Sequence, residues 1–128
     1  MPWTLRVDPS KRASYISFTG LVTFSDLAYA QVALAADPTF DPAFPLLIDL
    51  RRATEIVLTR DDMHALVMLA AVAPTTKRAI LVDGRGALSV AQVYESLRQS
   101  RADSDVLRAC RTLKECADWL GVELLEAD

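Results

Sequence analysis

The sequence has little of the residue types that metal and disulfide chemistry require. Among its 128 residues there are two cysteines, Cys110 and Cys116, and one histidine, His64. A Cys/His zinc site would therefore lack ligands, and the two cysteines do not form a Cys-x-x-Cys pair. We expect two buried thiols rather than a disulfide, no metal and no cofactor. Because no nucleophile lies at a suitable spacing from His64, triad catalysis is disfavoured.

The chain also lacks an excess of basic residues and a long apolar run. Its 14 Lys and Arg against 17 Asp and Glu give a formal net charge of -3, which disfavours nucleic acid and anionic membranes as partners. The longest apolar stretch, 65–74, is about half of the ~20 residues that a membrane-spanning helix needs. Residues 1–6 show no basic segment followed by an apolar run. We expect a cytoplasmic protein without a membrane span.

Glycine is scarce as well, with four residues, whereas 52% of the chain is hydrophobic and 24% is charged. This composition is typical of a globular domain and differs from that of disordered or fibrous chains. The proline-rich segment 37–45 is too short to be a domain linker. We therefore expect one domain over residues 1–128.

Apolar runs predict five strands. Two short runs, Trp3–Val7 and Tyr15–Thr19, flank a turn-forming segment and predict an antiparallel hairpin, with Gly20 ending the second strand. Two later runs are continuously apolar, which is typical of central strands buried on both faces. The last run is expected to form an edge strand. These three further strands are expected at 46–50, 79–83 and 105–110.

Four helices are predicted from the helical spacing of apolar residues, ending near residues 36, 73, 99 and 120. Each begins with a hydroxyl residue followed three positions later by an acid or an amide, the pattern of a capping box. The pairs are Thr23 with Asp26, Thr59 with Asp62, Ser89 with Gln92, and Thr112 with Glu115. The expected fold is α/β, a mixed five-stranded sheet, parallel after the opening hairpin and flanked by four helices.

This order of elements resembles the STAS domain, which occurs in anti-sigma-factor antagonists and at the cytoplasmic ends of sulfate transporters. Several segments are similar to small bacterial proteins grouped with STAS and CRAL-TRIO folds, and the likeness spans nearly the whole chain. It concerns fold rather than chemistry. The segments are Asp37-Pro38-Thr39-Phe40-Asp41-Pro42, Leu47-Ile48-Asp49-Leu50-Arg51, Ala79-Ile80-Leu81-Val82 and Arg111-Thr112-Leu113-Lys114-Glu115-Cys116-Ala117-Asp118-Trp119-Leu120.

The resemblance implies a phospho-acceptor. In antagonist STAS domains, the helix after the third strand opens with a phosphorylatable residue in an Asp-Ser-Ser/Thr-Gly motif. Here Leu58-Thr59-Arg60-Asp61-Asp62 stands at that place, and Thr59 alone keeps the hydroxyl. A helix N-terminus favours an anion, but the phosphate would lie beside two carboxylates. By this resemblance, Thr59 is the candidate phospho-acceptor of the chain.

The helix expected at 59–73 is apolar on two faces. A helix that is apolar all round is either deeply buried or covered by a partner, and a domain of this size has little room to bury one on every side. We therefore expect a contact surface on this helix, with segment 37–45 or the last helix as the alternative cover. The residues expected on this surface are His64, Met68, Leu69 and Val72.

Two further groups are candidates for binding a ligand or an anion. Asp49 and Asp83 are expected at the carboxyl ends of neighbouring strands, where open α/β sheets bind ligands. Gly84-Arg85-Gly86 joins a strand to a helix, as phosphate-binding loops do, but lacks the third glycine and the Gly-Lys-Ser/Thr sequence. Turn and capping roles explain the same residues.

Three functions remain open from the sequence. The leading interpretation is a non-enzymatic regulatory or protein-interaction module of STAS-like fold, acting through a protein partner or self-association. A carrier of a small apolar ligand is the alternative, suggested by the CRAL-TRIO side of the resemblance and by several aromatic residues, Phe40, Phe44, Tyr94 and Trp119. An enzyme would have to use Asp49, Asp83 and Arg85, and no acid, base and nucleophile set converges on them.

Overall fold

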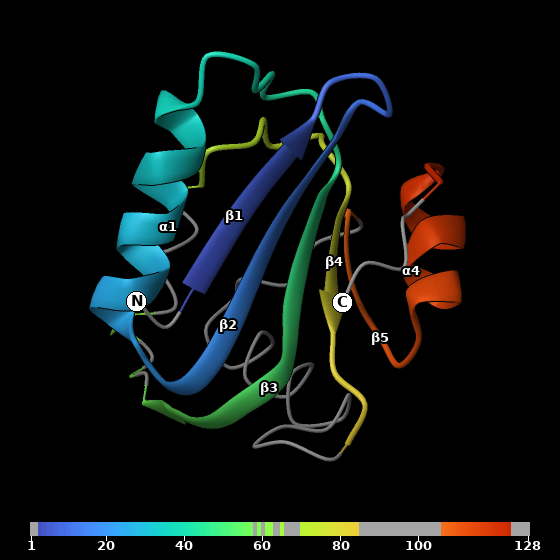
Figure 1. Cartoon of the computed structure of the whole chain (residues 1–128). Helices are drawn as coiled ribbons and strands as arrows, with labels where there is room; N and C mark the ends of the chain where they lie inside the picture. Colours follow the sequence, from blue (N-terminus) through green and yellow to red (C-terminus); the bar gives the residue numbers. More distant parts are fainter. Residues whose placement is uncertain are drawn as a thin grey trace.

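The fold is an α/β sheet structure, seen in a computed structural model that describes residues 3–57, 59, 61–62, 65, 70–84 and 106–123. All five strands form one sheet in the order β1-β2-β3-β4-β5 (Figure 1). β1 runs antiparallel to β2, and the later neighbours are parallel. This confirms the expected mixed sheet. The elements are β1 (Trp3–Asp8), β2 (Ala13–Thr23), α1 (Phe24–Ala36), β3 (Leu46–Val57), β4 (Arg78–Leu81), β5 (Leu107–Cys110) and α4 (Leu113–Leu120).

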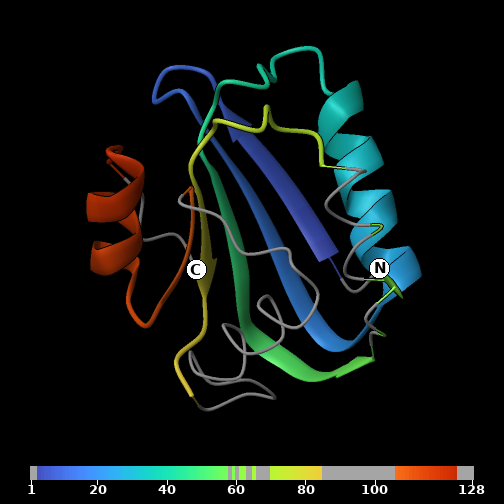
Figure 2. The same ribbon diagram turned by 180° about the vertical axis from the view of Figure 1, so that it is seen from behind.

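The two helices of the described part lie on opposite faces of the sheet. Successive strand residues point to opposite faces, so Tyr15 and Leu47 belong to the core cluster under α4, whereas Ile16 and Leu46 belong to the cluster under α1. α1 contacts β1 and β2, and α4 contacts β4 and β5. Figures 1 and 2 show the sheet between the two helices from its two sides. The helices therefore cover diagonally opposite halves of the sheet.

Side-chain caps place the starts of these helices where the sequence predicts them. At α1, the Asp26 amide donates to Thr23 Oγ1 at 3.4 Å, and the Thr23 amide donates to Asp26 Oδ2 at 2.9 Å. At α4, the Glu115 amide donates to Thr112 Oγ1 at 3.1 Å. Gly121, with a φ of 71°, ends α4 as expected. Neither α1 nor α4, the two helices of the described part, is long and apolar enough to cross a membrane.

The other two expected helices fall largely outside the described residues. The helix expected at 89–99 lies wholly outside them. Of the one expected at 59–73, the described residues Asp61, Asp62 and Ala65 are helical, whereas the described residues 70–73 are not. The predicted end of this helix near residue 73 is therefore wrong. The described part of the chain thus contains two complete helices in place of the four expected ones.

The second and third strands are longer than the apolar runs predict. The prediction that Gly20 ends β2 is wrong, because its φ of 68° accommodates an irregularity and the strand continues to Thr23. A positive φ suits glycine, which marks bulges inside strands. The added length of β2 pairs with the polar second half of β3, which runs to Val57 instead of Leu50.

Candidate functional site

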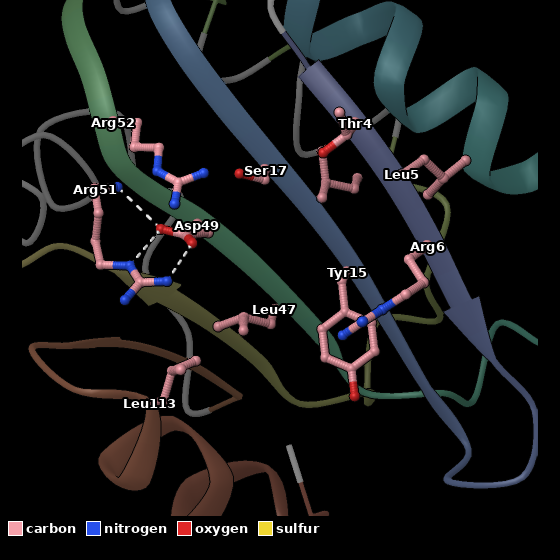
Figure 3. Close-up of a pocket in the computed structure, with 11 residues that line it drawn as sticks. Thr4, Leu5, Arg6, Tyr15, Ser17, Leu47, Asp49, Arg51, Arg52 and Leu113 are labelled. Atoms are coloured by element: carbon pink, nitrogen blue, oxygen red, sulfur yellow. Dashed lines mark hydrogen bonds and ion pairs between the residues drawn. The ribbon is translucent and has the colours of Figure 1, made fainter. Parts of the chain in front are cut away.

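A cavity lies on the face of the sheet that carries α4, over β1, β2 and β3. The described helices leave this half of the face open, because α4 packs on β4 and β5. The cavity encloses about 350 Å³ (Figure 3). Its lining mixes polar and apolar residues from all three strands and from the start of α4. These residues are Thr4, Leu5, Arg6, Tyr15, Ile16, Ser17, Leu47, Asp49, Arg51, Arg52 and Leu113.

An ion pair within β3 fixes one side of the cavity. The pairing of β3 with β2 is irregular between Asp49 and Arg52. The alternation of side chains is interrupted there, and Asp49, Arg51 and Arg52 all line the cavity. Arg51 Nε donates to Asp49 Oδ1 at 3.0 Å, and Arg51 Nη2 donates to Asp49 Oδ2 at 2.7 Å. The Arg51 amide also donates to Asp49 Oδ1 at 3.0 Å. This two-pronged contact, drawn in Figure 3, holds the guanidinium in one orientation.

A second arginine is held on the opposite side of the cavity. The guanidinium carbon of Arg6 lies 4.3 Å from the centre of the Tyr15 ring, a cation–π contact. Burial raises the pKa of Tyr15 above its ordinary value, so the phenol is neutral at pH 7. Its hydroxyl oxygen is buried and has no hydrogen-bond partner among the described residues. Tyr15 therefore forms part of the cavity wall with an uncharged ring.

The charges that line the cavity differ in sign from the charge of the chain. Among its described lining residues there are three arginines, Arg6, Arg51 and Arg52, and one acid, Asp49. These residues leave an excess of two positive charges, whereas the whole chain carries -3. The described lining of this cavity is thus richer in basic than in acidic side chains, unlike the chain as a whole.

The structure separates the predicted ligand residues. Asp49 lines the cavity, but the expectation that it closes its strand is wrong, because β3 continues for eight residues to Val57. Its carboxylate is bound to Arg51. Asp83 and Gly84 lie beyond β4, are exposed, and are not among the described residues that line the cavity. Arg85 and Gly86 lie outside the described residues.

Thr59, the candidate phospho-acceptor, has a capping role. The Thr59 amide donates to Asp62 Oδ2 at 2.9 Å, and the Asp62 amide donates to Thr59 Oγ1 at 3.0 Å. This is the reciprocal pattern that the sequence predicts. Thr59 is exposed, and its hydroxyl oxygen is used as the acceptor of the cap.

One residue of the expected interaction surface is part of the core. Val72 is 4% exposed and packs in the cluster under α1. The connecting segment 37–45 reaches this region, since the Ala73 amide and Thr76 Oγ1 both donate to the Pro42 carbonyl, at 2.9 and 2.8 Å. Val72 is therefore not a surface residue, and it belongs to the cluster against which Phe40 of segment 37–45 packs. His64, Met68 and Leu69 lie outside the described residues.

An apolar surface that the sequence analysis missed lies on α1. Its exposed residues include Tyr29 at 66% and Val32 at 61%. Ser25 and Ala36 share their face, since positions three or four apart lie above one another on a helix. We call Ser25, Tyr29, Val32 and Ala36 the outer stripe. No charged residue occurs from 27 to 36, which is the signal that could have revealed this surface.

The aromatic residues considered for an apolar ligand are used in packing. Phe40 and Phe44 meet edge to face, with ring centres 6.4 Å apart. Trp119 packs against the core cluster under α4 and donates from Nε1 to the Arg78 carbonyl at 3.0 Å. None of these three residues is among the described residues lining the cavity. Tyr94 lies outside the described residues.

Comparison with models of protein families gives no match, and comparison with curated proteins gives none either. The class that the structure defines is therefore an α/β domain with a mixed five-stranded sheet. A function has to be argued from the surfaces of the molecule.

Proposed function

We propose that the chain is a non-enzymatic regulatory or protein-interaction module of STAS-like fold, which binds a partner protein through the outer stripe of α1. The observation that carries this proposal is the lack of charge on an exposed helix face. Surface helices of globular proteins normally present charged or polar residues to water. A helix that is apolar on both faces supports a contact on its outer side.

The other described helix provides the contrast. The exposed positions of α4 include Lys114, Glu115 and Asp118, as expected for a helix with one face in water. On α1, the inward face buries Ala30 and Leu34, yet the outward face is also without charge. The difference between the two helices supports a role for the outer stripe beyond the fold itself.

The size of the stripe indicates a reversible contact. A helix of 13 residues is about 20 Å long and about 10 Å wide, so this face offers about 200 Å². A stable interface buries about 800 Å² on each partner. The stripe alone therefore supports an association that forms and dissociates readily, as a regulatory contact requires.

The partner surface has to be apolar and free of charge, because a charge buried against the stripe would have no counter-charge. A second copy of the chain meets this condition, since two outer stripes bring together only uncharged side chains. A different protein with an apolar helix face meets it equally. The mass of the complex distinguishes the two.

The test is a charge placed on the stripe. We expect Val32→Lys to abolish the association, whether it is detected as concentration-dependent self-association in sedimentation velocity or as recovery of a partner with the tagged chain. Lys114→Gln, which also changes the charge by one unit but at an exposed position of α4, should leave it unchanged. Because residue 32 is exposed, Val32→Lys should alter the free energy of unfolding by less than about 0.5 kcal/mol. Association that survives in a folded Val32→Lys variant contradicts the proposal.

A further inference from the structure

Independently of the outer stripe, we propose that the cavity on the open half of the sheet binds a small molecule that carries a phosphate group. The volume of about 350 Å³ falls within the range of small-molecule pockets, roughly 300–1,000 Å³. Such a volume suits a phosphate with a short organic group attached.

The charges of the described lining match this ligand in sign. Its charged side chains are three arginines and Asp49. A phosphate monoester carries about -1.5 to -2 at neutral pH, so it suits a lining in which arginines outnumber acids. The arginine guanidinium is also the side chain whose planar fork fits phosphate oxygens best.

Contacts with described residues orient the guanidiniums of Arg51 and Arg6. Asp49 orients Arg51 through the Nε and Nη2 contacts, and the Tyr15 ring supports Arg6. Figure 3 shows Arg6, Arg51 and Arg52 on the same side of the sheet, with Ser17 and Asp49 on the strands beneath them. Ordered cations lose less conformational freedom when a ligand binds. Two arginines of the site are therefore already oriented before an anion binds.

The apolar part of the lining indicates what the phosphate is attached to. The Tyr15 ring, Leu47 and Leu113 contribute apolar surface to the cavity, which would accept a ring or a short alkyl group. A wholly apolar ligand fits less well, since it would remove guanidiniums from water without replacing their hydrogen bonds. A small organic phosphate satisfies both parts of the lining.

The experiment titrates the full chain with phenyl phosphate and inorganic phosphate, using isothermal calorimetry for affinity and amide chemical shifts for location. We expect phenyl phosphate to bind, with shifts centred on Ser17 and Asp49. Arg52→Met and Arg6→Met should each weaken binding about tenfold or more, the effect of losing one charged hydrogen bond. Arg52→Lys keeps the charge and should lose less than Arg52→Met.

The matched control is Arg12→Met, which removes an exposed arginine from the turn between β1 and β2, outside the described lining. Its affinity for phenyl phosphate should equal that of the wild type. The proposal is overturned if phenyl phosphate does not bind, or if Arg6→Met and Arg52→Met, still folded by circular dichroism, bind as well as Arg12→Met. Val32→Lys should bind phenyl phosphate normally, so the two proposals fail separately.

Discussion

At the scale of single residues, the two thiols show how burial sets reactivity. Cys110 and Cys116 are free and buried in the cluster under α4, as the sequence predicts. Burial raises the pKa of both thiols above the ordinary value, because the thiolate loses its hydration. The reactive thiolate form is therefore scarce in the folded protein at pH 8.

We expect the folded chain to react with a thiol reagent such as DTNB far more slowly than the unfolded chain. At pH 8 an ordinary thiol with a pKa near ~8.5 is substantially ionised, whereas these two thiols remain protonated. Reaction should follow transient unfolding, so its rate should rise with urea below the unfolding transition. Rapid modification of two thiols in the native protein would contradict this description of the core.

Residue patterns close together in sequence were the most predictable. The Thr23–Asp26 and Thr59–Asp62 caps rest on residues three apart, and both occur as predicted. The ion pair of Asp49 with Arg51 also joins near neighbours, yet the sequence analysis missed it. Both residues lie in β3 where its pairing with β2 is irregular, and the apolar run that predicted this strand ends at Leu50.

At the scale of elements, Trp119 links α4 to two strands. Its Nε1 donates to the Arg78 carbonyl of β4 at 3.0 Å. The Arg108 guanidinium carbon, from β5, lies 4.2 Å from the ring, and Lys77 Nζ lies 4.5 Å from it. A single side chain thus combines apolar packing, a hydrogen bond and two cation–π contacts.

Replacing Trp119 should separate these contributions in urea unfolding followed by circular dichroism. Trp119→Ala should lower the free energy of unfolding by about 3 kcal/mol or more, the usual cost of removing a large packed ring. Trp119→Phe keeps a ring but loses the hydrogen bond, and should cost about 1 kcal/mol beyond the loss of ring size. Lys114→Ala, on the exposed side of α4, is the control. If Trp119→Ala matched this control, Trp119 would not anchor α4.

The starts of α1 and α4 were predictable because capping chemistry marks them locally, whereas the ends of β2 and β3 were not. β2 passes Gly20 because the glycine adopts a positive φ and the strand beyond it has a partner. Residues 51–57 are strand because they pair with that continuation, although their own sequence is polar. Pairing with a neighbouring strand decides where β2 and β3 end, and the spacing of apolar residues in the sequence does not indicate that pairing.

At the scale of the whole molecule, the sequence predicted the mixed sheet, but it placed Val72 at the surface. The apolar segment 59–73 was expected to be exposed in part, yet Val72 is buried. Among the described residues, α1 has an exposed face without charge, opposite the face that buries Ala30 and Leu34. Which residues are covered depends on contacts between segments that are distant in the sequence. An example is the contact of segment 37–45 with segment 73–76.

The most direct test of the central claim, that the outer stripe of α1 contacts a protein, is photo-crosslinking from position 32 in the cells that produce the chain. A photoreactive phenylalanine analogue replaces Val32, and the same analogue at Lys114 serves as the control. We expect a discrete product from position 32, at twice the chain mass for self-association or at the summed mass of a partner complex, and its loss with Tyr29→Asp. Equal, diffuse crosslinking from both positions would contradict the claim.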